Sequence, residues 1–341
     1  MNHVDDPETR AVSANISTST ITSSPDTSLL PVFIVGCGRS GSTMLGAMIG
    51  AHPDIICIPE GQFIVDLMPP GDSSREVDPV AIIDRIVKHW RFRVWDFDLG
   101  RRRPPRYDVQ PTYRAAIEWL VRQYARSVNR PSPHIWVDQA PGHETHIWKL
   151  LQHFTDAKFI HIVRDGRAVA ASIMPLDWGP NEIYSAARKW KERVGYGYVA
   201  GAALGPERVL HVRYEDVVER TEPTMQRVAH FLGVRFTPEM LSPTGLRLPS
   251  FTRHQHRLIG TPPQSDRTAG WRKTLSQRDI EIFESVVGDL LPLLGYRPVF
   301  GLEAKPLTFL ERRWHILLNE ARKAANALRS RYWQRRRPYR P

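Results

Sequence analysis

One stretch near the N-terminus combines glycines and hydroxyl side chains in an order suited to binding an anion. The apolar run 32–35 predicts a buried strand, and Gly36 and Gly41 follow it with four residues between them. This spacing matches the phosphate-loop pattern G-x-x-x-x-G-K-[ST], with Thr43 at its end and Ser42 in the lysine position. Glycines allow backbone N–H groups to turn towards an anion, and the following helix adds its own free N–H groups. We therefore predict a phosphate or sulfate site that lacks the usual lysine.

Arg39, inside the same loop, supplies positive charge in place of that lysine. A guanidinium group binds two oxygens of one anion at once. Ser40, Ser42 and Thr43 add hydroxyl donors. The alternative is a glycine turn between a strand and a helix that binds nothing.

A second basic site is predicted at the end of another apolar run. Residues 158–163 lead into Arg164-Asp165-Gly166-Arg167 and then into a helix that carries Ser172. Two guanidinium groups at the carboxyl end of a parallel strand suit bidentate binding of phosphate. A surface ion pair is the simpler alternative.

Acidic residues follow two further strands. Glu60 comes after the apolar run 55–58, at the kind of position where open α/β sheets place their chemistry; a solvated turn residue is the alternative. Asp138, His143 and His146 cluster after another strand, where helix capping and solvation at the surface explain them. Their spacing gives little support to a metal site.

Apolar runs predict five strands separated by amphipathic helices. They lie at 32–35, 55–58, 134–138, 158–163 and 208–213. This alternation requires a parallel sheet with right-handed connections and helices on both faces. We predict an α/β fold of three layers, like that of P-loop NTPases, with a basic amphipathic helix at the C-terminus.

Composition divides the chain of 341 residues into three parts. Residues 1–29, rich in Ser and Thr, are expected to be disordered; residues 30–300 form the main domain; residues 301–341 form the basic helix and tail. The tail holds eleven basic and three acidic residues, hence eight of the eleven net positive charges. The high isoelectric point therefore describes the tail, and no nucleic-acid partner is expected. The tail packs on the body or on a second subunit, or it binds a membrane surface.

The chain shows no apolar run of membrane-spanning length and no secretory signal, and its two cysteines form no disulfide framework. We expect a cytoplasmic protein, with peripheral contact at the inner membrane surface left open.

The loop, the Arg-Asp-Gly-Arg strand end and the segment Gly270-Trp271-Arg272-Lys273 together resemble the sulfotransferases that use 3′-phosphoadenosine 5′-phosphosulfate (PAPS). The likeness covers roughly residues 31–298 and is nearest to the branch that contains tyrosylprotein sulfotransferases and many bacterial relatives.

The resemblance implies a role for each matching residue. The first loop, from Arg39 through Ser40, Gly41 and Ser42 to Thr43, would hold the 5′-phosphosulfate. Arg164 and Ser172, eight residues apart, would hold the 3′-phosphate, with Arg267 or Lys273 reaching it from the closing segment. Tyr214 would lie near the adenine, and Glu60, 21 residues after Arg39, would be the catalytic base.

Two departures bear on the acceptor. Gln62 stands where the tyrosylprotein branch has an arginine for peptide acceptors, and Gln139 stands where many members have a lysine. A hydroxyl on a small molecule, a glycan or a lipid is therefore expected as the acceptor.

The predicted reaction moves the sulfuryl group of PAPS to that hydroxyl, with Glu60 taking the proton and Arg39 stabilising the leaving phosphate. No metal is expected to be required. A P-loop kinase, with Asp138 as its magnesium ligand, and a nucleotide-binding adaptor on a membrane are the alternatives. The sequence leaves open the acceptor, the oligomeric state and the roles of His52 and His143.

Overall fold

The computed structural model describes residues 28–93, 95–104, 110–247 and 268–336. Within them, five parallel strands form one sheet in the order β2-β3-β1-β4-β5. The strands are β1 (Leu30–Val35), β2 (Ile55–Ile58), β3 (Ile135–Asp138), β4 (Lys158–Val163) and β5 (Val209–Arg213). All five predicted strands are confirmed.

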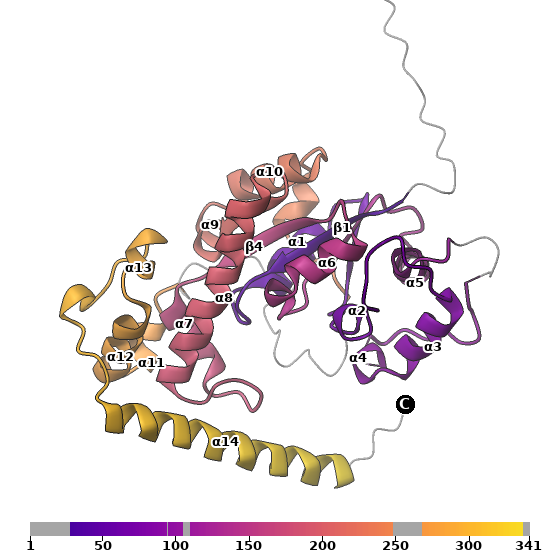
Figure 1. Cartoon of the computed structure of the whole chain (residues 1–341). Helices are drawn as coiled ribbons and strands as arrows, with labels where there is room; N and C mark the ends of the chain where they lie inside the picture. The colour runs from indigo at the N-terminus through magenta and orange to yellow at the C-terminus, as the bar shows by residue number, and fades with distance from the viewer. Residues whose placement is uncertain (1–27, 94, 105–109, 248–267, 337–341) are drawn as a thin grey trace, which may run out of the picture.

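Helices cover both faces of this sheet, as Figure 1 shows. The first seven are α1 (Ser42–Ile49), α2 (Phe63–Asp66), α3 (Pro79–Lys88), α4 (Trp90–Arg93), α5 (Tyr113–Ser127), α6 (Ile147–His153) and α7 (Gly166–Ile173). The other seven are α8 (Ile183–Leu204), α9 (Tyr214–Glu219), α10 (Thr221–Leu232), α11 (Trp271–Thr274), α12 (Gln277–Val287), α13 (Leu290–Leu293) and α14 (Phe309–Arg336). Short 3-10 turns are η1 (His143–Thr145), η2 (Pro238–Leu241) and η5 (Gly301–Glu303).

The alternation of side chains along β1 shows why two helical layers are needed. Phe33 and Val35 enter an apolar cluster with residues of α5 and α6, whereas Val32 and Ile34 enter another with residues of α1 and α10. All four side chains are fully buried. Because successive residues of a strand point to opposite faces, an apolar strand must be covered on both sides. The predicted three-layer α/β fold with a central parallel sheet is confirmed.

A third apolar cluster joins α7, α8, α11 and α12 beside the sheet. Helix α8 is absent from the sequence-based prediction, and its glycines explain why its pattern is weak. A Cβ atom at Gly197 would lie 2.4 Å from the His161 ring, and one at Gly201 would lie 2.3 Å from His211. These positions must stay small because α8 packs directly on β4 and β5.

The C-terminal helix begins at Phe309, inside the predicted segment 301–341, and runs as one long rod below α12 in Figure 1. No helix among the described segments is long and apolar enough to cross a bilayer. The expectation of disorder concerns residues 1–29, of which 1–27 lie outside the described residues. Leu29 is buried and Leu30 opens β1, so the core begins inside that predicted segment.

Candidate functional site

The loop between β1 and α1 is a tight turn pressed against the neighbouring strand. Gly36, Arg39 and Gly41 all have positive φ angles, of 144°, 73° and 98°. A Cβ atom at Gly36 would lie 2.3 Å from the carbonyl oxygen of Ile162, so only glycine fits there. Gly41 precedes α1 without a side-chain cap, so the first N–H groups of the helix are free to face an anion.

Arg39 and the predicted second site meet in space. The Nε of Arg39 donates a hydrogen bond to the Ser172 hydroxyl at 3.1 Å, and Nη1 of Arg164 donates to the Arg39 carbonyl at 3.1 Å. Burial lowers the pKa of Arg39, the charge of Arg164 lowers it further, and Glu60 acts in the opposite direction. Two neighbouring guanidinium groups, one of them partly desolvated, form a strong site for a phosphate-like anion.

Two buried polar atoms at this place have no hydrogen-bond partner within the described part of the chain. They are the Ser40 hydroxyl and Nε of Arg164. Buried polar groups in native proteins nearly always have a hydrogen-bond partner. Two such atoms without a partner, at Arg164 and next to Arg39, therefore point to a missing anionic ligand. The residues present therefore fit the phosphate groups of a nucleotide.

The ring of Tyr214 packs against both the loop and the second site. Its ring lies 4.4 Å from the guanidinium carbon of Arg164 in a cation–π contact. A Cβ atom at Gly41 would lie 2.5 Å from the same ring. The backbone of Arg164 is fixed as well, because its carbonyl accepts a hydrogen bond from Trp190 at 3.1 Å. Tyr214 therefore lies beside the loop and the second site. Its place near the adenine stays a prediction.

Arg167 takes no part in this site, so the prediction of two guanidinium groups facing one anion is wrong for one of them. It is buried in an ion network, 2.8 Å from Asp165 and 2.7 Å from Glu284. Its guanidinium group also lies over the ring of Trp271, 4.1 Å from the centroid. Arg167 is the second residue of α7, four residues after the end of β4, and at this position its side chain points towards α12 and away from Arg164.

Glu60 lies after β2 with 29% of its side chain exposed. Its Oε2 accepts a hydrogen bond from Gln62 at 2.7 Å and lies 3.5 Å from Nη1 of Arg91. Burial raises the pKa of Glu60, while Gln62 and Arg91 oppose that rise. Trp95 holds the backbone by donating to the Glu60 carbonyl at 3.1 Å. A carboxylate with a raised pKa is suited to accept a proton near neutral pH.

Arg91 is a site residue that the sequence-based prediction missed. It lies on α4, 31 residues after Glu60 and behind a loop, and its guanidinium group also stacks on Trp90 at 4.1 Å. No spacing pattern connects it to Glu60, because only the packing of α4 beside the end of β2 brings them together.

Asp138 and His143 are buried, so the prediction that surface solvation explains them is wrong. One oxygen of Asp138 accepts N–H groups of Gly61 and Ala140 at 3.1 and 2.9 Å, and the other lies 2.8 Å from Nε2 of His143. Burial disfavours the charged ring, but the charge and hydrogen bond of Asp138, together with the charges of Glu144 and Glu60, outweigh burial and raise the pKa of His143. This pair fixes the turn that carries Glu60 and engages both carboxylate oxygens of Asp138.

The remaining predicted residues lie as follows. Thr43 donates its hydroxyl to Gln139 at 3.1 Å, and Ser42 is half-buried at the start of α1. Arg267 lies outside the described residues, and Lys273 is exposed on α11. His52 holds the turn before β2, with one ring nitrogen 3.0 Å from the Arg235 carbonyl and the other accepting from Asp54.

No group of three potential metal ligands among His, Cys, Asp and Glu is found in the described ranges. A reaction without a metal therefore stays a prediction.

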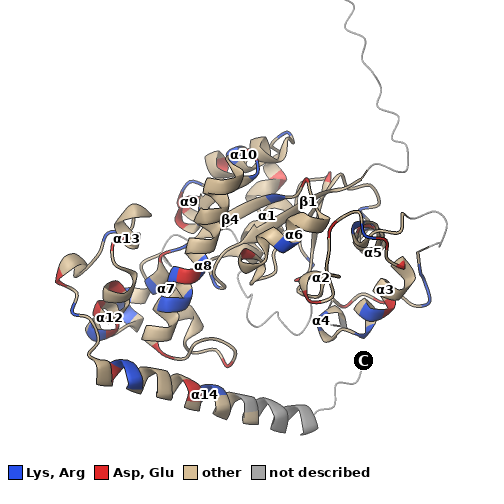
Figure 2. Cartoon of the chain, in the orientation of Figure 1, with Lys and Arg blue, Asp and Glu red and all other residues tan. Residues whose placement is uncertain are grey.

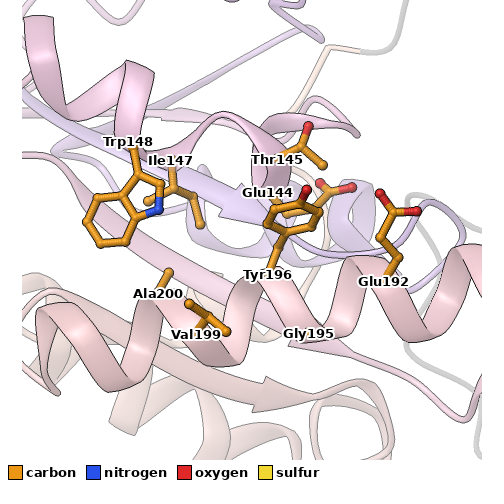
Figure 3. A pocket seen from close by; sticks show the side chains of 9 residues that line it. All are labelled: Glu144, Thr145, Ile147, Trp148, Glu192, Gly195, Tyr196, Val199 and Ala200. Atoms are coloured by element: carbon orange, nitrogen blue, oxygen red, sulfur yellow. The ribbon is translucent and has the colours of Figure 1, made fainter.

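A separate groove of about 320 Å³ lies between α6 and α8 (Figure 3). The nine residues that line it are Glu144, Thr145, Ile147, Trp148, Glu192, Gly195, Tyr196, Val199 and Ala200. None of them belongs to the predicted site, and the only charged side chains among them are carboxylates. A nucleotide carries phosphates, so this groove is not suited to hold it.

Most of the chain matches proteins of one known family. Residues 31–238 match the Sulfotransferase family. A protein-tyrosine sulfotransferase of Drosophila melanogaster is 23% identical over 279 residues, which cover 78% of this chain and 52% of that protein. The nodulation protein NoeE of Sinorhizobium fredii is 26% identical over 323 residues, covering 80% of this chain and 68% of its own length. The chain thus spans about half of the fly enzyme.

Among solved structures, the sulfotransferase domain of the Synechococcus PCC 7002 olefin synthase superposes with a TM-score of 0.52. The two are 21% identical, and the match covers 80% of this chain and 98% of that domain. At this identity the likeness concerns the fold.

Proposed function

Because the chain belongs to the Sulfotransferase family, we propose that it transfers the sulfuryl group of PAPS to an acceptor hydroxyl, giving a sulfate ester and adenosine 3′,5′-bisphosphate. The observation that carries this proposal is the meeting of Arg39, Ser172 and Arg164 at one point. Such a site places a phosphate-binding loop and a second phosphate-binding group within the span of one nucleotide.

In the proposed reaction each group on the chain has one task. The acceptor hydroxyl attacks the sulfur of PAPS, a new sulfur–oxygen bond forms, and the bond from sulfur to the 5′-phosphate breaks. Glu60 takes the hydroxyl proton, and the electron pair of the broken bond stays on the phosphate. Arg39, Ser40 and the free N–H groups of α1 stabilise the charge that develops there.

The side chain of Glu60 is arranged for this task. Its Oε2 is held by Gln62 and Arg91, so the carboxylate keeps one orientation while the other oxygen is available to a hydroxyl. Asp138 holds the following residue, Gly61, through its N–H group. A base that is fixed before the acceptor arrives loses little entropy when it reacts.

For the acceptor, we propose only the class of molecule that carries the hydroxyl. The fly relative is named for protein tyrosine. In this chain Gln62 is engaged with Glu60 itself. We therefore favour a hydroxyl on a small molecule, a glycan or a lipid over a peptide. The alternative of a kinase is disfavoured because Ser42 replaces the phosphate-loop lysine and Asp138 is buried in a pair with His143.

Thermal-shift measurements test the nucleotide. We expect adenosine 3′,5′-bisphosphate to raise the melting temperature and Mg-ATP to leave it unchanged; the reverse result would support a kinase. The E60Q variant should then show the same shift with adenosine bisphosphate. Its turnover on a panel of phenol, sugar and lipid hydroxyls should fall by about 10²–10⁴-fold, the usual range for a lost general base. Binding with no transfer by the wild type to any hydroxyl would favour an adaptor.

A further inference from the structure

Helix α14 is attached to the body through polar contacts on one of its sides. Most of these contacts are made with Asn181, which lies just before α8. The Asn181 N–H donates to Asn319 at 3.1 Å, Asn326 donates to the Asn181 side chain at 3.1 Å, and Arg322 donates to the Asn181 carbonyl. Next to them, His315 lies 2.8 Å from a carboxylate oxygen of Glu182. Asn319 is buried, so this contact fixes which side of the helix faces the protein.

An apolar stripe on the opposite side of α14 consequently remains uncovered. Leu310, Trp314, Leu317 and Leu328 recur at intervals that place them along one side of a helix, and they are 77%, 65%, 63% and 67% exposed. Phe309, in the first turn, is 69% exposed. The expected attachment of the tail to the body is therefore present, but polar residues make it and the apolar stripe does not. A monomeric protein rarely exposes an apolar strip of this length without a partner for it.

Charge decides which partner fits. The tail from residue 301 carries eight of the eleven net positive charges of the chain. Arg312, Arg313 and Lys323 are exposed on the described part of α14, and Figure 2 shows basic residues along it in blue. A second copy of this helix would bring two such tails together, and their charges would repel. An anionic lipid surface attracts the same charges and accepts the apolar side chains among its headgroups.

We propose that α14 binds the surface of a membrane rich in anionic lipid, lying along it with Leu310, Trp314, Leu317 and Leu328 inserted at the level of the headgroups. The helix lies on the bilayer and does not span it, because charged residues interrupt its apolar residues in every turn or two. Trp314 suits this depth because an indole ring is apolar with one polar edge. Because Asn181 holds α14 rigidly, the sulfotransferase domain is fixed at the surface.

Vesicle sedimentation with the full chain tests the proposal. The wild type should sediment with vesicles of phosphatidylcholine and phosphatidylglycerol, and weakly with phosphatidylcholine alone. The variant L310A/W314A/L317A keeps the net charge and removes the apolar side chains. Its affinity for the anionic vesicles should fall on the order of 100-fold, given the apolar area lost. Melting temperature with adenosine bisphosphate shows that the variant is folded.

A matched control removes exposed apolar side chains from another face. Trp148 and Val199 line the groove of Figure 3 and are 52% and 62% exposed. The variant W148A/V199A should bind the vesicles as the wild type does. Equal binding by the α14 variant and the wild type would overturn the proposal, since charge alone would then account for it. Absence of wild-type binding would also overturn it, as would a dimer in light scattering that the α14 variant abolishes.

Discussion

The Nε of Arg39 donates a hydrogen bond to the hydroxyl of Ser172 at 3.1 Å, across 133 positions of the sequence. One residue belongs to the loop after β1 and the other to α7 after β4, the strand next to β1 in the sheet. Without this contact the loop after β1 and the end of β4 would be two separate anion sites. With it they form one site that a single nucleotide can bridge.

Replacing Ser172 with alanine should weaken the binding of adenosine 3′,5′-bisphosphate by about 10- to 100-fold, because a hydrogen bond to a charged group contributes about 1.5–3 kcal/mol. Isothermal titration calorimetry measures the change. S285A is the control, since the Ser285 hydroxyl donates only to the Ile282 carbonyl within α12. An unchanged affinity in S172A would place the 3′-phosphate elsewhere.

The two arginines of the Arg-Asp-Gly-Arg segment should respond differently to replacement by methionine. R167M leaves Asp165 and Glu284 buried without their partner, so the free energy of unfolding should fall by about 3–5 kcal/mol. R164M should lose nucleotide affinity at least 10-fold with a much smaller loss of stability. Urea unfolding and calorimetry separate the two effects. Equal losses of stability would contradict the assignment of Arg164 to the ligand.

Replacing Arg91 with methionine should move the acid limb of the rate–pH profile to higher pH. Glu60 acts as a base in its ionised form, so the rate rises with pH as Glu60 loses its proton. The charge of Arg91 lowers the pKa of Glu60 against the effect of burial, so its removal raises that pKa. The ratio kcat/KM measured across the acid range reports the shift.

R103M is the control for this change. Arg103 forms an ion pair with Asp84, at a distance of 2.6 Å, and this pair lies outside the site. A profile that keeps its midpoint in R91M would mean that Glu60 is not the titrating base.

Alanine substitutions at Gly41 and Gly142 separate the effect of backbone strain from the effect of a steric clash with a neighbouring side chain. Both have positive φ angles, 98° and 105°, so alanine at either should cost about 1–3 kcal/mol. Only at Gly41 would the new methyl group meet the Tyr214 ring; at Gly142 nothing lies within 4 Å. G41A should therefore lose nucleotide affinity as well as stability, and G142A stability alone. Equal nucleotide affinity in both variants would show that Tyr214 does not shape the loop.

His161 should make the protein less stable in mild acid. It is buried against His211, with the two Nδ1 atoms 3.0 Å apart, and burial lowers its pKa to about 3. The unfolded chain has the ordinary value of about 6.5, so between these values it binds more protons than the folded state. Stability should fall as pH drops from about 6.5 to about 3, by up to about 1.4 kcal/mol per pH unit.

The measurement is urea unfolding at several pH values. H161L should show a shallower dependence on pH than the wild type, while H146L, which changes an exposed histidine, should keep the full slope. A wild-type slope in H161L would contradict this origin of acid sensitivity.

Local patterns in the sequence were sufficient for the strands and the loop. An apolar strand such as 158–163 and a glycine spacing such as Gly36 to Gly41 act within a few residues, so the chain displays them directly. Pairing Arg164 with Ser172 came from the resemblance to the sulfotransferases, although both residues lie on the segment from β4 into α7.

Only the tertiary structure decided which of these residues meet. The order of the strands places α7 beside the first loop and so brings Ser172 to Arg39. The direction in which α7 leaves β4 sends Arg167 into the core, and the packing of α4 brings Arg91 to Glu60. The polar attachment at Asn181 leaves the apolar side of α14 exposed. Such contacts depend on the relative placement of elements far apart in the chain, and no local spacing records it.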